Sequence, residues 1–319
     1  MNDQLTLKDR LRGALYGCAI GDALGLAGEF MTRDEVKMRY PESIRDYDDI
    51  FQDAHRSQWA PGEWTNDTEV SVIILESIIE NDAFDLHKIA SRLKQWYQET
   101  PADLPSMYHF IFRDPDYEKD PTRVAHEVWK NMDKEEASNE ALPRAVFAGI
   151  SAERYIERGA EIAHVTHADP RCIGASMAIA RMAHDLIWHN EATSPEELIE
   201  IVRPIDDRII PYINWAREDS LSPLNLDDED TLWYCRKAMA TGLWSVWHNL
   251  SPMEAFDAIL AEGGDVDTNA AVALSLLGLR YGPEGFPPQL REKLLRHDYL
   301  EDLADRLHDY FKRHEIHAH

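Results

Sequence analysis

EGGDVDTNAA at residues 262–271 places two carboxylates, a hydroxyl and an amide within five consecutive positions. Gly263 and Gly264 precede these polar residues and allow the backbone to turn tightly. Asp265 and Thr268 belong to the residue types preferred at helix N-termini, and residues 270–279 are mainly apolar. The stretch therefore predicts a tight turn that leads into a buried helix.

The same stretch also has the composition of a cation site. Asp265 and Asp267 are two positions apart in a turn, so their oxygens can point toward one place. Crowded carboxylate and hydroxyl oxygens are the ligands that Mg²⁺ and Mn²⁺ prefer. Because Asp and Thr are also common capping residues, the stretch alone leaves a metal site and an ordinary helix cap as alternatives.

A second stretch has the same organisation. GEWTNDTE at residues 62–69 places a hydroxyl, an amide and a carboxylate side by side before the apolar residues 70–79. Asn66 and Glu69 fit a capping box, which again marks a helix start. If the two helix starts meet in space, they supply enough oxygen atoms for two metal ions completed by water. The six side chains are Thr65, Asn66, Asp67, Asp265, Asp267 and Thr268.

The remainder of the chain predicts an all-α fold. Apolar residues recur with helical spacing, and we find neither convincing period-two alternation nor a repeat of 20–50 residues. We expect one compact domain over residues 1–319, with a frayed tail at 314–319 and a ligand site built from helix N-termini and loops at one end. The predicted helices include residues 7–26, 85–98, 122–132, 144–150, 151–165, 171–189, 230–248, 252–261, 288–296 and 299–313.

Composition limits the function classes. The 319 residues carry a formal net charge of −26, from 59 acidic and 33 basic residues. This charge argues against general nucleic-acid binding and against anionic membranes. The first residues lack the features of a signal peptide, and no apolar run is long enough to span a bilayer. Cys18, Cys172 and Cys235 are far apart, so we expect reduced core residues and a cytoplasmic protein.

Five motifs in order resemble the ADP-ribosylglycohydrolases, the group that includes the dinitrogenase reductase-activating glycohydrolase. GALYGCAIGDALG at residues 13–25 is followed by Glu29, and TNDT at 65–68 stands where the family usually has Thr-Asp-Asp-Thr. SNEALPR at 138–144 resembles Ser-Asn-Gly-x-Leu-Met-Arg, and THADP at 166–170 also fits. The fifth motif is GGDVDT at 263–268. The resemblance implies a compact orthogonal multi-helix bundle.

The resemblance also implies an activity and a set of site residues. It implies a hydrolase that cleaves the N- or O-glycosidic bond between ADP-ribose, or a related ribosyl group, and an acceptor. Two Mg²⁺ or Mn²⁺ ions would be held by the six oxygen side chains named above. The catalytic residues implied are Glu29, Asp67 and Asp267, and the substrate-binding residues are Gly21, Asp22, Ser138, Asn139 and His167. We expect a monomer acting on an ADP-ribosylated protein or small molecule.

Three positions depart from the family pattern and keep other functions open. Asn66 replaces an aspartate, Glu140 replaces a glycine and Pro143 replaces a methionine. A carboxylate at residue 140 is unfavourable beside a phosphate unless it points away. One alternative is therefore a protein that binds ADP-ribose or a nucleotide without hydrolysing it. A second is a structural protein that keeps the fold and has lost the site.

Several further assignments stay open at this level. The family often contributes an aspartate from the middle of the chain, and Asp103, Asp114 and Asp116 are equal candidates. The polar loop at residues 43–60 is either a lid over the metal site or a tolerated insertion. The dipeptides at 184–185 and 297–298 (both His-Asp) are similar to metal ligands of all-helical phosphohydrolases, but they lack the supporting residues.

Overall fold

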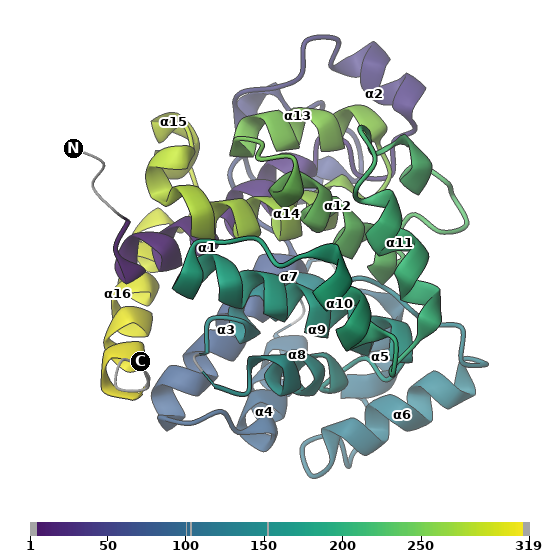
Figure 1. Ribbon diagram of the computed structural model, residues 1–319, viewed down its shortest axis with the longest axis vertical. Coiled ribbons are helices and arrows are strands. Elements are labelled where there is room, and N and C mark those ends of the chain that lie inside the picture. The colour runs from purple at the N-terminus through teal and green to yellow at the C-terminus, as the bar shows by residue number, and fades with distance from the viewer. Residues whose placement is uncertain (1–4, 100, 103, 152, 315–319) are drawn as a thin grey trace.

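The computed structural model describes residues 5–99, 101–102, 104–151 and 153–314, and within these ranges the prediction of an all-α fold is confirmed. The helices run in several directions rather than as one parallel bundle (Figure 1). Their bounds are α1 Leu7–Gly25, α2 Arg33–Arg39, α3 Asn66–Asn81, α4 Leu86–Gln98, α5 Ser106–Phe112, α6 Pro121–Asn131, α7 Leu142–Ala148, α8 Tyr155–His164, α9 Pro170–His184, α10 Pro195–Val202, α11 Ile210–Trp215, α12 Cys235–Trp247, α13 Pro252–Glu262, α14 Val266–Tyr281, α15 Pro288–Glu292 and α16 His297–His314.

Helices from opposite ends of the chain form the centre of the fold, where α1 packs along α14 (Figure 1). A Cβ added at Gly13 or Gly17 would lie 2.1 Å from a carbonyl oxygen of α14, and one added at Gly21 would lie 2.5 Å from the Ala270 backbone. Because these distances leave no room for a side chain, the two backbones touch directly. The small-residue face of α1 is therefore a helix-packing surface.

Two hydrophobic clusters surround this central pair. The larger one draws buried side chains from the beginning to the end of the described chain, including α1, α7, α9, α12, α13, α14 and α16. The smaller one joins α3 to α4, α5 and α6 through residues such as Val70, Leu93 and Tyr108. Helix α3 contributes to both clusters, so its N-terminus is held from two sides.

The predicted helix ranges largely match, with three wrong boundaries. The helix predicted over residues 288–296 ends at Glu292. The helix predicted from residue 230 begins only at Cys235, because the preceding residues form a turn. In this turn, the backbone N–H of Thr231 donates to the carbonyl oxygen of Asp228, and the Thr231 hydroxyl donates to the Asp228 carboxylate. The helix predicted from residue 151 begins at Tyr155. The predicted frayed tail lies outside the described residues, apart from His314, which ends α16.

The cysteine prediction is confirmed in its structural part. Cys18, Cys172 and Cys235 are all buried and all free thiols. Burial raises the pKa of the Cys18 thiol well above its usual value. None of the described helices combines the length and the apolar character needed to cross a bilayer.

The contact between α1 and α14 predicts a large effect of a single methyl group. We expect Gly17→Ala to lower the free energy of unfolding by about 3 kcal/mol, because the new Cβ forces the two backbones apart. Urea unfolding measures this change. The matched control is Lys8→Ala on the same helix, which removes only an exposed ion pair with Asp305 and should cost less than about 1 kcal/mol. Equal stability of Gly17→Ala and the unchanged chain would contradict the packing argument.

Candidate functional site

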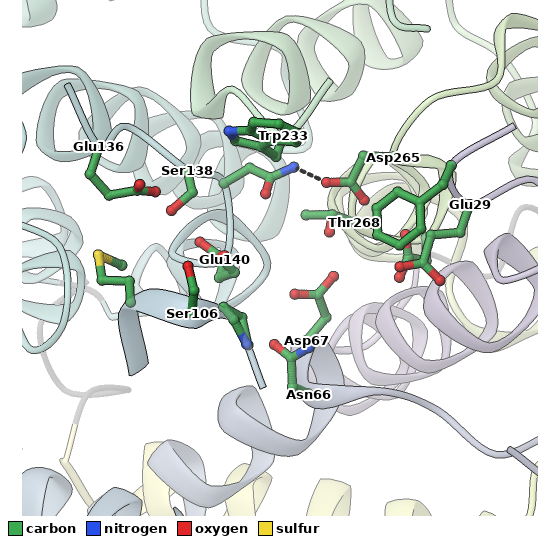
Figure 2. A pocket seen from close by; sticks show the side chains of 15 residues that line it. Glu29, Asn66, Asp67, Ser106, Glu136, Ser138, Glu140, Trp233, Asp265 and Thr268 are labelled. Atoms are coloured by element: carbon green, nitrogen blue, oxygen red, sulfur yellow. Dashed lines mark hydrogen bonds between the residues drawn. The ribbon is translucent and has the colours of Figure 1, made fainter. Parts of the chain in front are cut away.

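A cavity of about 340 Å³ lies where the starts of α3 and α14 meet the end of α1 and the turn before α7. Figure 2 shows Glu29, Asp67 and Asp265 around one part of the cavity and Glu136 and Ser138 around another. No lysine or arginine of the described chain lines it. The cavity wall instead carries six carboxylates: Glu29, Asp67, Glu136, Glu140, Asp265 and Asp267.

The double-glycine turn places the first of these carboxylates. Gly263 and Gly264 have φ angles of +68° and +79°, and added Cβ atoms would lie 2.3 Å from Met31 O and 2.1 Å from Leu226 O. Only glycine satisfies both constraints. The backbone of Gly264 also pairs with Met31 in an isolated antiparallel bridge. This pairing holds the segment that carries Glu29 against the start of α14.

Asp265 occupies the N-cap position of α14 without acting as a cap. Its side chain makes no capping hydrogen bond. Instead, Asn139 Nδ2 donates to Asp265 Oδ2 at 2.7 Å, the bond drawn as a dashed line in Figure 2. For this residue, the interpretation as an ordinary helix cap is therefore wrong. The contact also joins two of the sequence motifs, which lie 126 residues apart.

The start of α3 is organised by Asp22, which lies behind the cavity. Thr65 N and Thr68 N each donate to the Asp22 carboxylate at 3.0 Å, and Thr68 Oγ1 donates at 2.6 Å. Burial raises the pKa of the Asp22 carboxyl group, and hydrogen bonds from Thr68 and Thr65 lower it. Burial is the larger effect, so the resulting pKa is about 6. Asp22 and Gly21, which were expected to bind substrate, do not line the cavity, because α14 and α3 cover them.

Two buried carboxylate oxygens in the cavity have no hydrogen-bond partner among the described residues: Asp67 Oδ2 and Asp267 Oδ1. Burial raises the pKa of Asp67 well above its usual value, and the charges of Asp22 and Asp265 add to this. Burial is also the largest cause that raises the pKa of Asp267, and the negative charges of Glu29 and Asp265 raise it further. Unpaired buried carboxylates are costly, and a divalent cation relieves both the repulsion and the lost hydrogen bonds. The donor set therefore fits hard cations.

The third motif places Ser138 and Glu140 on the wall and His167 behind it. Arg144 donates to Thr166 Oγ1, which lies 2.7 Å from His167 Nδ1. His167 Nε2 lies 2.9 Å from Glu140 Oε2 and 3.2 Å from Ser138 Oγ. His167 is 1% exposed, so it acts on the cavity through these two side chains.

Glu140 keeps its charge although its side chain is only 14% exposed. Burial by itself raises the pKa of this carboxyl group, but hydrogen bonding and charge from His167, together with a hydrogen bond from Ser138, outweigh it. The net result is a pKa below the usual value. An ionised Glu140 on the cavity wall repels anionic groups that approach this end.

Glu29 is held by the long loop at residues 43–60. His55 Nε2 lies 2.6 Å from Glu29 Oε2, and Arg56 donates to the Glu29 carbonyl oxygen. The loop is packed rather than lid-like: Tyr47 is buried and donates to Leu290 O at 2.9 Å, and the buried Trp59 contacts the His55 ring edge-on. The loop thus positions Glu29 through His55 and Arg56.

The structure brings most of the predicted site residues together. Eight line the cavity: Glu29, Asn66, Asp67, Ser138, Asn139, Asp265, Asp267 and Thr268. Four others lie behind it: Gly21, Asp22, Thr65 and His167. The sequence interpretation missed seven residues at or beside the cavity: Phe30, His55, Pro105, Ser106, Met107, Glu136 and Trp233. None of these seven carries a local signal, because each approaches the site through tertiary packing.

Neither described mid-chain aspartate joins the cavity. Asp114 accepts a hydrogen bond from Asp116 N at 2.8 Å, and Asp116 pairs with Lys119 at 3.1 Å on the surface. The third candidate, Asp103, lies outside the described residues. The middle of the chain instead contributes Ser106 from the start of α5.

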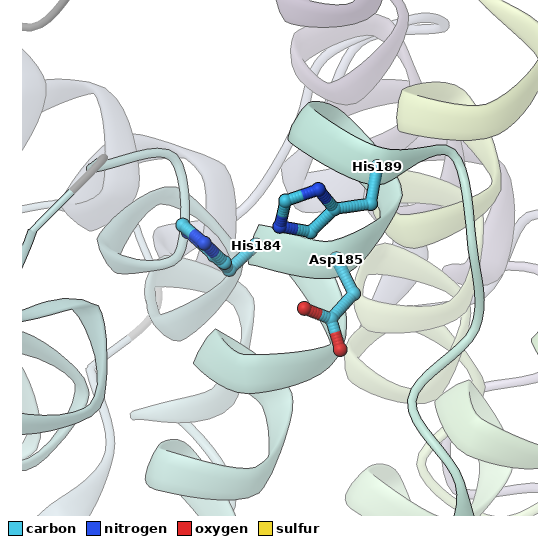
Figure 3. Close-up of side chains that lie close together, drawn as sticks. All are labelled: His184, Asp185 and His189. Carbon is cyan, nitrogen blue, oxygen red and sulfur yellow. The ribbon is translucent and has the colours of Figure 1, made fainter. Parts of the chain in front are cut away.

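A separate cluster follows α9, where a π-helical turn spans Asp185–His189. Ligand-capable atoms of His184, Asp185 and His189 all lie within 4.8 Å of one another (Figure 3). Arg181 Nε donates to Asp185 Oδ2 at 2.9 Å, so the carboxylate is already neutralised. The cluster is therefore part of the packing at the C-terminal end of α9, and none of its three residues lines the carboxylate-rich cavity.

Comparisons with known proteins agree with the motifs. A sequence profile described as ADP-ribosylglycohydrolase matches residues 3–316. ADP-ribosylarginine hydrolase Tri1 of Pseudomonas putida is 28% identical over 313 residues, which cover 94% of this chain and 78% of that protein. The ADP-ribosyl-dinitrogen reductase glycohydrolase of Rhodospirillum rubrum is 26% identical over 307 residues, which cover 91% of each chain.

A solved structure supports the fold. A chain of an "ADP-ribosylglycohydrolase-related protein complex" superimposes with a TM-score of 0.70 and 23% sequence identity. The superposition covers 95% of this chain and 98% of that chain. The architecture of the described residues is therefore the one seen in that protein.

The position of Asp22 predicts a structural role that can be measured. We expect Asp22→Ala to lower the free energy of unfolding by roughly 2–3 kcal/mol, because three buried donors at the start of α3 lose their acceptor. Urea unfolding measures the change, and Asp305→Ala serves as the control because it removes an exposed carboxylate paired with Lys8. A cost for Asp22→Ala no larger than that of the control would be inconsistent with this role.

Proposed function

Because this chain belongs to the ADP-ribosylglycohydrolase family, it is a hydrolase of glycosyl bonds, and we propose that it uses two Mg²⁺ or Mn²⁺ ions. The bond that it cleaves joins ADP-ribose, or a related ribosyl group, to an N- or O-linked acceptor. The names of the relatives in P. putida and R. rubrum support ADP-ribosylated protein as the substrate. A small ADP-ribosylated molecule is the alternative substrate.

The observation that carries the proposal is the meeting of two oxygen-rich helix starts. Buried oxygens of Asp67 and Asp267 without partners lie in one cavity that is rich in carboxylates. The residues that would hold the cations are Asn66, Asp67, Asp265, Asp267 and Thr268 on the cavity wall. Thr65, the sixth predicted ligand, lies behind the wall, where its hydroxyl accepts from Asp67 N. When bound, the cations would supply positive charge that orients the ribose hydroxyls and a water molecule beside the scissile bond.

The protein's own groups supply the proton chemistry. Hydrolysis breaks the bond between the ribose carbon and the acceptor, and a water molecule adds to that carbon through an oxocarbenium-like transition state. The Glu29 carboxylate, or one of the other catalytic carboxylates, Asp67 and Asp267, takes a proton from this water and passes a proton to the departing acceptor. Negative charge on the wall stabilises the positive charge that develops on the sugar. Ser138 and Asn139 contact the ADP-ribosyl group, and His167 fixes Ser138.

Three further properties belong to the same proposal. The chain forms one domain over residues 1–319, which is supported by a hydrophobic cluster that draws on most of the described chain. It acts as a monomer. It resides in the cytoplasm, which is supported by three thiols that are free.

Glu140 favours one alternative, a protein that binds a ribosylated ligand without hydrolysing it. Its ionised carboxylate lies on the wall of the cavity, and Asn66 removes one carboxylate from the usual cluster. Turnover of ADP-ribosylated substrates with and without Mg²⁺, beside calorimetry with ADP-ribose, separates binding from catalysis. A fold without a functional site would give no turnover and no change in melting temperature with either ligand.

Removing one carboxylate tests the metal site. We expect Asp267→Ala to abolish the increase in melting temperature with Mn²⁺ and to lower kcat at least about 1,000-fold, because charge stabilisation at the scissile bond is lost. Scanning fluorimetry and a release assay measure the two effects. The control is Asp116→Ala, which removes an exposed carboxylate outside the cavity and should leave both unchanged. Full activity of Asp267→Ala would refute the assignment.

Glu29→Gln separates proton transfer from metal binding. We expect this substitution to lower kcat by about 10²–10⁴-fold while the effect of Mn²⁺ on the melting temperature persists, because the amide has similar shape but cannot accept the proton. Steady-state kinetics and scanning fluorimetry on the same sample provide the comparison. Loss of the Mn²⁺ effect would instead assign Glu29 to the cation site.

A further inference from the structure

A second cavity, of about 260 Å³, shares Glu29 and Phe30 with the first. We infer that it receives the acceptor half of the substrate, and specifically the polypeptide segment beside the modified residue. This inference rests on the proposed function. It adds a docking surface for a protein substrate, built from the start of the chain and the loop at residues 43–60.

The position of Glu29 between the cavities gives the first argument. Its carboxylate lines both of them, with His55 at 2.6 Å on the side of the second cavity and the carboxylates of Asp67 and Asp267 lining the first. A group that transfers a proton at a glycosidic bond must lie beside that bond. If the ribosyl group occupies the carboxylate-rich first cavity, the acceptor extends past Glu29 into the second.

The surface of the second cavity gives a second, independent argument. Seven large apolar side chains are exposed in the described part of the chain, and three of them line this one cavity. Phe30 is 58% exposed, Met38 is 69% exposed and Phe51 is 36% exposed. Clustered exposed apolar side chains at a concave surface are typical of a site where another protein binds.

Charged groups of the same wall are already engaged with their neighbours. Asp53 Oδ2 accepts from Arg56 Nη1 at 2.6 Å, and Glu35 accepts from Thr32 N at 2.8 Å in the capping box of α2. The Arg39 guanidinium lies 3.8 Å from the centre of the Phe51 ring and holds it in place. The wall therefore recognises its ligand mainly through apolar contacts.

The charge of the protein indicates which polypeptide segment fits. The chain carries a formal net charge of −26, so a basic segment is attracted to it, and an acidic one is repelled. The occupant is thus a basic polypeptide segment that places an apolar side chain against Met38 and Phe51.

Comparison of a protein substrate with a small one tests the inference. The probes are histone ADP-ribosylated on arginine and ADP-ribosylated free arginine. We expect Met38→Asp to lower kcat/KM for the histone about tenfold, mainly through KM, and to change kcat/KM for free arginine less than twofold. Phe51→Ala should act in the same direction. Leu295→Asp, a change at another exposed apolar residue outside both cavities, is the matched control and should alter neither value.

Each outcome decides one question. Equal losses on both substrates, or unchanged histone hydrolysis in Met38→Asp and Phe51→Ala, would overturn the inference and leave the proposed function standing. Hydrolysis of neither substrate by the unchanged chain would instead overturn the proposed function. In that case binding of the ADP-ribosylated histone peptide, followed by fluorescence anisotropy, decides the inference: weaker binding by Met38→Asp supports it, and equal binding overturns it.

Discussion

Direct backbone contact between α1 and α14 is the constraint on which the rest of the structure depends. Gly13, Gly17 and Gly21 let the two helices touch without intervening side chains. Because the helices come from opposite ends of the chain, the contact closes the fold and aligns their ends at one place. There the bridge between Met31 and Gly264 locks the two connecting segments together. The relative positions of the site residues at the end of α1 and the start of α14 therefore depend on this packing.

The site concentrates negative charge that the fold does not neutralise. Six carboxylates line one cavity, and no described lysine or arginine lines it. Burial and mutual repulsion raise the pKa values of Asp67 and Asp267, and Asp22 adds to the field from behind. Such an arrangement opposes folding unless a cation joins it, as is common where stability is given up for function. The N-termini of two helices lessen the repulsion because their dipoles favour negative charge.

The loop at residues 43–60 connects this charged centre to the surface. Its inner side packs on the core through Tyr47 and Trp59, and His55 contacts Glu29. Its outer side carries Phe51 at the second cavity. One segment thus positions a side chain beside the polar cavity and presents an apolar surface next to it. Glu29 lines two cavities of different chemical character, and the proposed placement of the sugar in one and the acceptor in the other rests on this position.

The sequence by itself determined the all-α class and most helix ranges, because capping residues, glycine turns and helical periodicity act over a few neighbouring positions. Its two oxygen-rich stretches supplied five of the residues that line the cavity, and the family resemblance supplied Glu29, Ser138 and Asn139. Only the tertiary structure decided which polar residues face the cavity. Asp22 and His167 carry motif positions yet support the wall from behind, while His55 and Glu136 approach the cavity without any motif. The reason is physical: the direction of a side chain depends on how its helix or loop packs against distant segments, and local sequence does not encode that packing.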